Sequence, residues 1–356
     1  MDVKARQRHS GSELGRAYAP GPTRGNGADS FAAPRVVTFT PAPCIDKVYF
    51  LDRVRSGQVN RADRVDTYFA GNGVNVARAL HLAGNTVSAV LPIDGEGNLE
   101  RSSTDLLSMV RGIDVGVPLR TNVTIVDETG MTTNINSLPA PLDPSQWSSL
   151  CQGAIQEVQR LGADWFVLGG SLPLDADTGE TVDIQPLFRT MRSLGVSVCL
   201  DSPMGHNALS EWSRGGFPDL VKPNAQELSM MTGIDIRCLG DVVDAANRVR
   251  ATGVGTVLTS LGSDGILESG PQGVRWARGP QTQVINTTGA GDAALAGYLS
   301  VAHPDSPEAE WHDEALKRAV SWGALAVRQA TTVLPHVVRG PYEVLIGLPL
   351  LDHQLA

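Results

Sequence analysis

The strongest signal in the sequence is NTTGAGDAALAGYL, which spans residues 286–299. Gly289 and Gly291 let the backbone turn tightly and approach a ligand, because glycine has no Cβ. The small apolar residues that follow predict a helix, whose first N–H groups have no partner within the helix and favour a bound anion. Asp292 falls in the first turn, where it is either a helix-end charge or a catalytic base beside a phosphate. The glycines and the motifs described below favour the base.

On either side of this segment, apolar strand-like runs alternate with helical patterns. The expected strands span residues 36–40, 87–91, 165–168, 196–200, 220–221 and 256–259. The expected helices include residues 74–82, 146–161, 225–231 and 308–329. Strands rich in valine and leucine that alternate with helices predict an α/β protein whose mostly parallel sheet is covered on both faces.

Two segments interrupt this alternation. Residues 61–69 and 122–136 read as antiparallel strands, and the second turns at residues 127–130, where Gly130 supplies the positive φ of a tight turn. A small sheet inserted into an α/β domain is typical of a lid or a dimer contact. An ordinary edge hairpin is the open alternative.

A second glycine-rich segment, GNGVNVAR, spans residues 71–78. One interpretation is a dinucleotide-binding loop, with Asp94 about 20 residues further on to hold a ribose. Two features oppose it: Val76 stands in place of the third glycine, and the loop follows a strand of the inserted sheet rather than the first strand of the domain. A glycine turn that directs Asn72 and Asn75 at a polyol is the better interpretation.

Two further segments carry weaker signals. In KPNAQEL, residues 222–228, Asn224 is a plausible helix N-cap and Glu227 completes a capping box. The functional interpretation is that both side chains face metal-bound water near a phosphate. TSLGSDG, residues 259–265, is a strand that leaves into a glycine turn, which alone is a weak phosphate-loop signal.

Six segments, taken in this order, are similar to the motifs of one family. They are TPAPCID at residues 40–46, AGNGVNVA at 70–77, RTNV at 120–123, GSLP at 170–173, KPNAQE at 222–227 and GAGD at 289–292. From residue 36 to the last helix, the chain resembles the PfkB/ribokinase family of carbohydrate kinases. Within that family it is most similar to the branch of 1-phosphofructokinases and tagatose-6-phosphate kinases.

The resemblance implies a ribokinase-like three-layer α/β/α domain over residues 34–356, with a small inserted β-sheet lid from about 45–70 and 119–137. It also implies a homodimer formed through that lid. Residues 1–33 contain many glycines and prolines and no apolar periodicity, which predicts a disordered extension rather than a docking arm.

The resemblance further implies ATP-dependent transfer of the γ-phosphate to a hydroxyl of a phosphorylated ketohexose, with fructose 1-phosphate as the expected substrate. Asp292 would accept the hydroxyl proton. The backbone N–H groups of Gly289, Ala290 and Gly291 would stabilise the transferred phosphoryl group. Asp46, Gly71, Asn72, Asn75, Arg120 and Asn122 would hold the sugar; Asn224, Ser260, Gly262 and Gly265 would lie along ATP; Glu227 would act on Mg²⁺ through water.

One departure from the branch bears on the substrate. Asn72 stands where the branch has a lysine associated with the phosphate already on the sugar. Arg120 remains as a bidentate partner for such a phosphate. A kinase of an unphosphorylated sugar or nucleoside, or a catalytically silent sugar-phosphate sensor, therefore stays open as an alternative.

The composition excludes several classes of binding partner and of binding site. The chain has 356 residues and a net charge of −9, from 29 Lys+Arg against 38 Asp+Glu, so we expect no nucleic-acid partner. No apolar run approaches the ~20 residues that span a bilayer, so we expect no membrane partner. No lysine follows a glycine, as a P-loop requires. The four cysteines lack zinc-site spacing and predict a reducing, cytoplasmic location.

Overall fold

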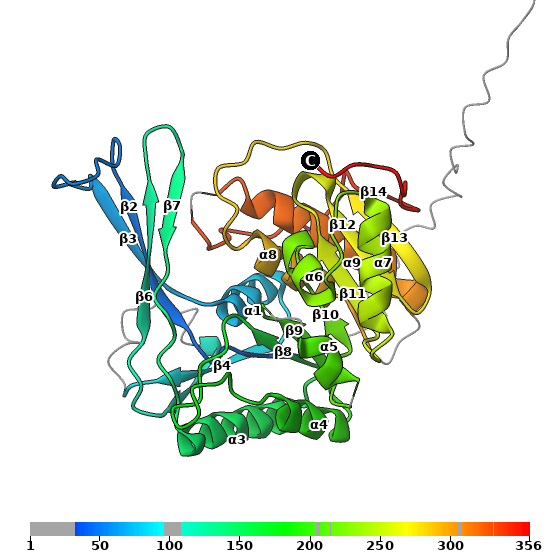
Figure 1. Cartoon of the computed structure of the whole chain (residues 1–356), viewed down its shortest axis with the longest axis horizontal. Helices are drawn as coiled ribbons and strands as arrows, with labels where there is room; N and C mark the ends of the chain where they lie inside the picture. Colours follow the sequence, from blue (N-terminus) through cyan, green and yellow to red (C-terminus); the bar gives the residue numbers. More distant parts are fainter. Residues whose placement is uncertain (1–32, 96–107, 204–206, 214, 305–307, 330) are drawn as a thin grey trace, which may run out of the picture. The chain divides into compact units, whose positions relative to one another are not determined.

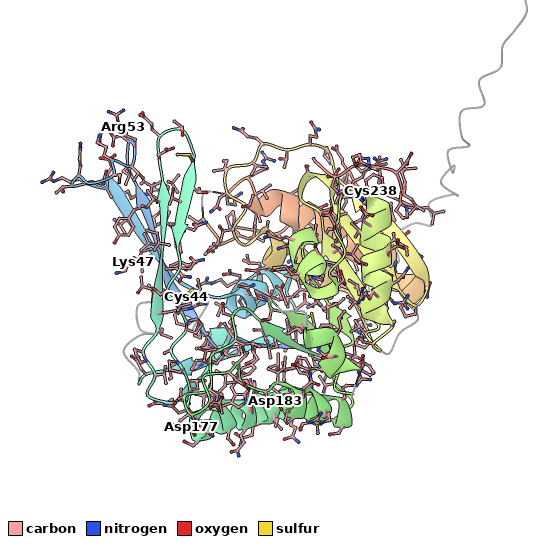
Figure 2. All side chains as sticks on the ribbon, viewed as in Figure 1. Cys44, Lys47, Arg53, Asp177, Asp183 and Cys238 are labelled. Atoms are coloured by element: carbon pink, nitrogen blue, oxygen red, sulfur yellow. The ribbon has the colours of Figure 1, made fainter. Side chains whose placement is uncertain are left out.

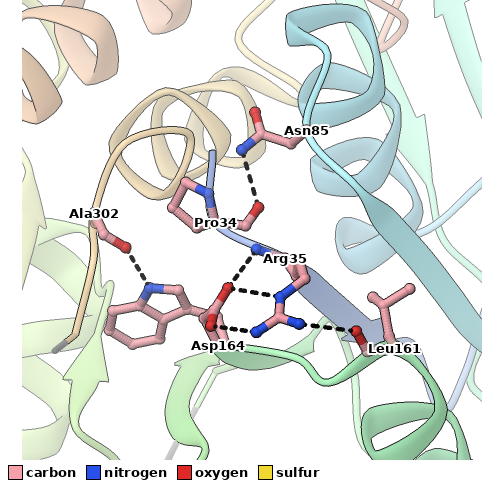
Figure 3. Close-up of polar contacts among 7 residues, drawn as sticks. Pro34, Arg35, Asn85, Leu161, Asp164 and Ala302 are labelled. Atoms are coloured by element: carbon pink, nitrogen blue, oxygen red, sulfur yellow. Dashed lines mark hydrogen bonds and ion pairs between the residues drawn. The ribbon is translucent and has the colours of Figure 1, made fainter. Parts of the chain in front are cut away.

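The computed structural model describes residues 33–95, 108–203, 207–213, 215–304, 308–329 and 331–356. The extension predicted for residues 1–33 lies outside the described residues except for Ala33. The first described residues are anchored (Figure 3). The main-chain N–H and the guanidinium of Arg35 bond the carboxylate of Asp164 at 2.7–3.3 Å, and Asn85 Nδ2 donates to the carbonyl of Pro34 at 3.1 Å. These bonds fix the start of the first strand.

The helices and strands carry the labels of Figure 1. The strands are β1 (Val36–Phe39), β2 (Cys44–Phe50), β3 (Arg64–Ala70), β4 (Val87–Ile93), β5 (Val110–Asp114), β6 (Arg120–Val126), β7 (Thr132–Ile135), β8 (Trp165–Gly169), β9 (Ser197–Asp201), β10 (Leu220–Val221), β11 (Thr256–Ser260), β12 (Ile266–Gly270), β13 (Gly273–Arg278) and β14 (Leu345–Gly347). The helices are α1 (Asn72–Ala83), α3 (Pro144–Leu161), α4 (Gln185–Ser193), α5 (Asn207–Trp212), α6 (Ala225–Thr232), α7 (Leu239–Arg250), α8 (Ala290–Leu299) and α9 (Glu308–Ala326), with a 3₁₀ turn, η2, at Gly262–Asp264. Every strand and helix expected from the sequence has a counterpart among them.

The large sheet has ten strands in the order β14-β13-β12-β11-β10-β9-β8-β1-β4-β5. From β5 to β11 each strand runs parallel to its neighbours, while β12, β13 and β14 continue the sheet as antiparallel strands. The predicted mostly parallel sheet is confirmed. The antiparallel edge was not predicted, because the sequence signal was the alternation of strands with helices, which a hairpin lacks.

Side chains that alternate along the central strands pack into two cores, one on each face of the sheet. Phe166 and Leu168 of β8 pack with residues of α3, α4, α6 and α7. Trp165 and Val167 of the same strand pack with residues of α1, α8 and α9. This arrangement confirms the predicted α/β/α class.

A second sheet has four strands in the order β3-β2-β6-β7, drawn at the left of Figure 1. β2 runs antiparallel to β3 and parallel to β6, and β6 turns into β7 with Gly130 at a φ of 82°. In Figure 2, Cys44 lies at the lower end of this sheet and Arg53 at its upper end. β3 continues through Gly71 into α1, so the lower end adjoins the large domain. The small inserted sheet is therefore confirmed.

Candidate active site

The carboxyl ends of neighbouring parallel strands bring polar residues to one edge of the large sheet. Asp201 ends β9, Lys222 follows β10, and Ser260 ends β11. Because these three strands pair in parallel, the three residues lie on adjacent strands at the same edge. In open parallel sheets this edge is where ligands bind.

Helix α8 begins with Gly289 as its N-cap at a φ of 82°. A Cβ at that position would lie 3.2 Å from the carbonyl oxygen of Thr332, so both the φ and the space favour glycine. Among the described residues, the N–H of Gly291 has no hydrogen-bond acceptor, whereas the N–H of Ala290 donates to the carbonyl of Thr287 at 3.2 Å. The helix start therefore offers a free donor and a positive dipole end, as an anion site requires.

Asp292 lies in the first turn of α8 and is 7% exposed. Its Oδ2 accepts a hydrogen bond of 2.8 Å from Asn75 Nδ2 on helix α1. Burial and the charge of Asp201 raise the pKa of Asp292 to about 7. The bond from Asn75 and the charge of Lys222 oppose that rise. A carboxylate whose pKa is near neutrality is matched to the work of a general base.

A buried ion pair lies beside Asp292. Lys222 Nζ is 3.1 Å from Asp201 Oδ1, and both side chains are 7% exposed. A Cβ on Gly291 would come 2.9 Å from Lys222 Nζ, so the ammonium lies against the first turn of α8. Burial lowers the pKa of Lys222, but the carboxylates of Asp201, Asp292 and Glu227 outweigh this effect and raise the pKa above its usual value. The ammonium therefore adds positive charge at the helix start.

On the small sheet, Asp46 and Asn122 lie opposite each other on β2 and β6. Asn122 Nδ2 donates to Asp46 Oδ1 at 3.2 Å, and the thiol of Cys44 donates to the same oxygen at 3.2 Å. Burial and Asp46 raise the pKa of the Cys44 thiol, so the thiol stays protonated. The charge of Arg120 lowers the pKa of this thiol, and the charge of Asp292 raises it. Two of the residues predicted to hold the sugar, Asp46 and Asn122, are thus in contact, and a third, Asn75, bonds Asp292.

Arg120, at the start of β6, is held by uncharged groups. Nη1 donates to the carbonyl of Ser137 at 2.8 Å, and Nη2 donates to the carbonyl of Ala42 at 3.2 Å. Nη2 also donates to Ser171 Oγ, just beyond β8, at 3.4 Å. Because none of these partners carries a negative charge, the guanidinium keeps its positive charge for an anion.

Gly71 and Asn72 lie where β1, β8 and α1 meet. Gly71 has a φ of 140°, and a Cβ there would come 2.7 Å from Thr40 Cγ2, just after β1. The amide of Asn72 lies against the residue that follows β8, because a Cβ on Gly170 would be 3.6 Å from Asn72 Oδ1. Position 72 therefore contributes an uncharged amide to the site.

The predicted capping box at the start of α6 is confirmed. The N–H of Glu227 donates to Asn224 Oδ1 at 2.8 Å, and the N–H of Asn224 donates to Glu227 Oε2 at 2.9 Å. The N–H of Ser260 donates to the carbonyl of Pro223 at 3.0 Å, which joins the end of β11 to this helix start. Gly262 and Gly265 follow on the η2 turn, and no atom lies within 4 Å of the place that a Cβ on Gly262 would take.

Within the described residues, no group of three or more His, Cys, Asp and Glu side chains could hold a metal ion directly. Glu227 Oε1 takes no part in the capping box, and this fits contact with Mg²⁺ through water, which that ion usually keeps in its shell. In the same part of the chain, no helix is both long and apolar enough to cross a membrane.

The patterns in the sequence do not single out Asp201, Lys222 or Arg78 as site residues. A signal for Asp201 is present, because it directly follows an apolar strand whose carboxyl end reaches the ligand-binding edge. Lys222 is a buried lysine after a strand, within a motif already noted. Arg78 lies three residues after Asn75, on the same face of a helix in which no other Lys, Arg, Asp or Glu occurs.

Comparisons with known proteins agree with this architecture. A model described as pfkB family carbohydrate kinase matches residues 40–337. The 1-phosphofructokinase of Escherichia coli strain K12 is 28% identical over 299 residues, which are 83% of this chain and 92% of that protein. The 1-phosphofructokinase of Rhodobacter capsulatus is 31% identical over 276 residues, which are 75% of this chain and 84% of that protein.

Solved structures show the same fold. The crystal structure of phosphofructokinase-2 from Escherichia coli in complex with substrates and products matches with a TM-score of 0.70. The match covers 85% of this chain and 96% of that one at 24% identity. At this identity the likeness concerns the fold.

Proposed function

The chain belongs to the pfkB family of carbohydrate kinases, which makes it an ATP-dependent sugar kinase, and from this premise we propose that it transfers the γ-phosphate of ATP to a hydroxyl of fructose 1-phosphate. Two relatives that align with three quarters of the chain or more are named 1-phosphofructokinase. The proposed substrate agrees with those names and with the uncompensated charge of Arg120.

The single observation that carries the proposal is the position of Asp292. Its carboxylate is buried in the first turn of α8, next to the free N–H of Gly291 and the ammonium of Lys222. Phosphoryl transfer requires an acceptor for the hydroxyl proton beside an anion site for the transferred group. This arrangement supplies both within one helical turn.

In the proposed reaction the sugar hydroxyl oxygen forms a bond to the γ-phosphorus, and the bond from that phosphorus to the bridging oxygen of ADP breaks. The hydroxyl proton passes to Asp292, which Asn75 orients through its hydrogen bond. The N–H groups of Gly289, Ala290 and Gly291 stabilise the charge on the phosphoryl oxygens. For this the Ala290 N–H must release the carbonyl of Thr287, its partner in this structure.

Asn224 and Ser260, with Gly262 and Gly265 on the following turn, are proposed to lie along ATP. Two observations support this placement: the open space beside the backbone of Gly262, and the hydrogen bond that joins the end of β11 to the start of α6. Glu227 would hold Mg²⁺ through water with its free Oε1. When bound, the ion neutralises charge on the phosphates.

The sugar is proposed to bind between the small sheet and the start of α1, with its hydroxyls on Asp46, Asn122 and Asn75 and on the turn at Gly71. Its phosphate would bind Arg120, whose hydrogen-bond partners among the described residues include no carboxylate. A second candidate is a kinase of an unphosphorylated sugar. It is favoured by the uncharged amide of Asn72, which supplies no second cation for a phosphate.

The small sheet is proposed to act as a lid and to form the contact of a homodimer. Met131, Ile135 and Leu138 are all more than half exposed on or beside β7. Exposed apolar side chains gathered on one small sheet are typical of a protein–protein contact. A cytoplasmic location is proposed with the function, because a kinase of this kind requires ATP.

The test is release of ADP with Mg-ATP across fructose 1-phosphate, fructose 6-phosphate, tagatose 6-phosphate, fructose and ribose. Turnover of fructose 1-phosphate with the highest kcat/KM supports the proposal. Turnover of free sugars alone would replace it with the second candidate. Asp292→Asn is the matched control, because its remaining ADP release measures background hydrolysis. A wild-type protein no faster than this control on every sugar would contradict both functions.

A further inference from the structure

Arg78 is a half-buried cation to which the proposed reaction gives no role. It lies on α1 between the buried residues Ala77 and Ala79, three residues after Asn75. Its Nη1 atom is fully buried and has no hydrogen-bond partner among the described residues. Burial lowers the pKa of Arg78 to about 10, and the charge of Asp46 opposes that shift. A buried donor atom that has no partner calls for a specific explanation, above all when it belongs to a charged group.

Two further polar atoms near Arg78 are buried in the same way. Asn75 Oδ1 and Thr332 Oγ1 are also buried and without a hydrogen-bond partner among the described residues. Asn75, Arg78 and Thr332 line one cavity of about 10 Å³, beside Gly289. This is room for about one water molecule, and a buried water makes about three hydrogen bonds. The three residues offer a donor, an acceptor and a hydroxyl that can be either.

We propose that Arg78 is a positioning residue for Asp292, which acts through one water molecule shared with Thr332 and through the amide of Asn75. The inference rests on the proposed function, in which Asp292 is the base. Arg78 Nη1 donates to the water, the water donates to Asn75 Oδ1, and Asn75 Nδ2 donates to Asp292 Oδ2 at 2.8 Å. The guanidinium lies two hydrogen bonds from the amide that holds the base.

In the proposed network, the hydrogen bond from the water determines which end of the Asn75 amide faces the carboxylate of Asp292. With Oδ1 held by the water, the NH₂ end points at Asp292 and the carboxylate is held by a donor. Without the water, the amide is free to turn its oxygen toward the carboxylate, where two acceptors repel each other. The positive charge of Arg78 also polarises the chain of hydrogen bonds and strengthens the last of them.

The segment that carries Thr332 is fixed to the start of α8. A Cβ on Gly289 would come 3.2 Å from the Thr332 carbonyl oxygen, so this segment packs directly on the N-cap. The proposed network therefore joins α1, α8 and the segment after α9 around one base. The charged groups that act on Asp292 come from other elements: Asp201 from β9, Lys222 after β10, and Asp46 from β2. Arg78 is proposed to act instead from the opposite end of the Asn75 amide, since both residues line the same cavity.

Three substitutions separate the hydrogen bond from the charge. Arg78→Met removes both, Arg78→Gln keeps a donor without the charge, and Arg78→Lys keeps both in a different shape. We expect the Met variant to lower kcat about 100-fold, the scale of a misplaced catalytic group, with little change in KM for the sugar. The acid limb of its pH profile is expected to move upward, because the bond that favours ionised Asp292 weakens. The Gln and Lys variants are expected to regain part of kcat.

Thr332→Val is the second test of the proposal. It removes only the hydroxyl that is proposed to bond the water. We expect it to change kcat and the acid limb in the same direction as Arg78→Met, and the double variant to add little. An unmoved acid limb together with a higher KM for sugar phosphates would overturn the proposal and make Arg78 an anion-binding residue. Thermal unfolding of each variant shows that a loss of kcat is not a loss of fold.

A crystal structure of the unliganded protein gives a measurement that does not depend on turnover. We expect one ordered water within about 3.2 Å of Arg78 Nη1, Asn75 Oδ1 and Thr332 Oγ1. A dry cavity, or an Arg78 side chain turned away from Asn75, would overturn the inference while the sugar kinase proposal stands. Absence of turnover on every sugar would instead contradict the proposed function, whatever the cavity holds.

Discussion

Lys222 Nζ lies 3.1 Å from Asp201 Oδ1 in a buried ion pair that adjoins the start of α8. The two residues come from the ends of neighbouring parallel strands, β10 and β9. They act on Asp292 in opposite directions, since Asp201 raises its pKa and Lys222 lowers it. The pair therefore sets how readily the proposed base takes up a proton.

Replacement of Lys222 by methionine leaves Asp201 buried without its partner. We expect the free energy of unfolding to fall by about 3–5 kcal/mol, as when one partner of a buried ion pair is removed. Urea unfolding measures this. The pKa of Asp292 is expected to rise as well, which the acid limb of kcat/KM reports. The double variant Asp201→Asn/Lys222→Met is the control and should regain part of the stability. An equally stable single variant would argue against the pair.

Replacement of Asp292 by asparagine should lower kcat by at least about 100-fold, the lower end of general-base contributions. It should also stabilise the protein at neutral pH. The folded-state pKa of Asp292 is raised, so the wild type loses stability as the pH rises from the unfolded value near 4 to about 7. Asparagine carries no such penalty. The gain in Tm should therefore grow over this range and then stay constant; a gain that is independent of pH would contradict the burial argument.

The pH profile of the wild type should show an acid limb near pH 7, because the base must be ionised to accept the hydroxyl proton. The pKa that this limb reports belongs to a group of interacting charges rather than to Asp292 alone. Steady-state kcat/KM between about pH 5 and 9 measures it. Asn75→Ala removes the hydrogen bond that lowers this pKa, so its limb should move upward. A wild-type profile that stays flat down to about pH 5 would mean that Asp292 is not the titrating base.

Local patterns in the sequence carry the features that depend on neighbours along the chain. The start of α8 at Gly289 and the capping box of Asn224 and Glu227 are of this kind, and both occur as predicted. The parallel strands of the central sheet can be predicted equally well, because each is a short apolar run that alternates with helical patterns.

Other features depend on which segments meet in space. The pairing of Asp201 with Lys222 requires that β9 and β10 be neighbours, and strand order is not a local property. The cavity at Arg78 is lined in part by Thr332, from a segment far along the chain. The sequence shows the charge of Arg78 but not its lack of a partner, which only packing reveals.

Replacement of Asn72 by lysine tests where the sugar phosphate binds. If position 72 faces that phosphate, a lysine there should lower KM for fructose 1-phosphate about tenfold, the effect of ~1.4 kcal/mol of added attraction, and leave KM for fructose unchanged. Gln152→Lys, an exposed change on α3, is the control for added charge elsewhere. Equal effects of both lysines, or an equal effect on fructose, would place the phosphate away from Asn72.

Replacement of Ile135 by glutamate tests the proposed homodimer of the small sheet. Ile135 is exposed on β7, and Met131 and Leu138, close to it in the sequence, are exposed as well; a dimer contact would bury all three. A charge buried there without a partner weakens association, so light scattering should find a dimer for the wild type and a monomer for the variant. Leu348→Glu, an exposed change near the C-terminus, should leave the dimer intact. If the wild type is monomeric, or if only the Leu348 variant dissociates, the small sheet is not the contact.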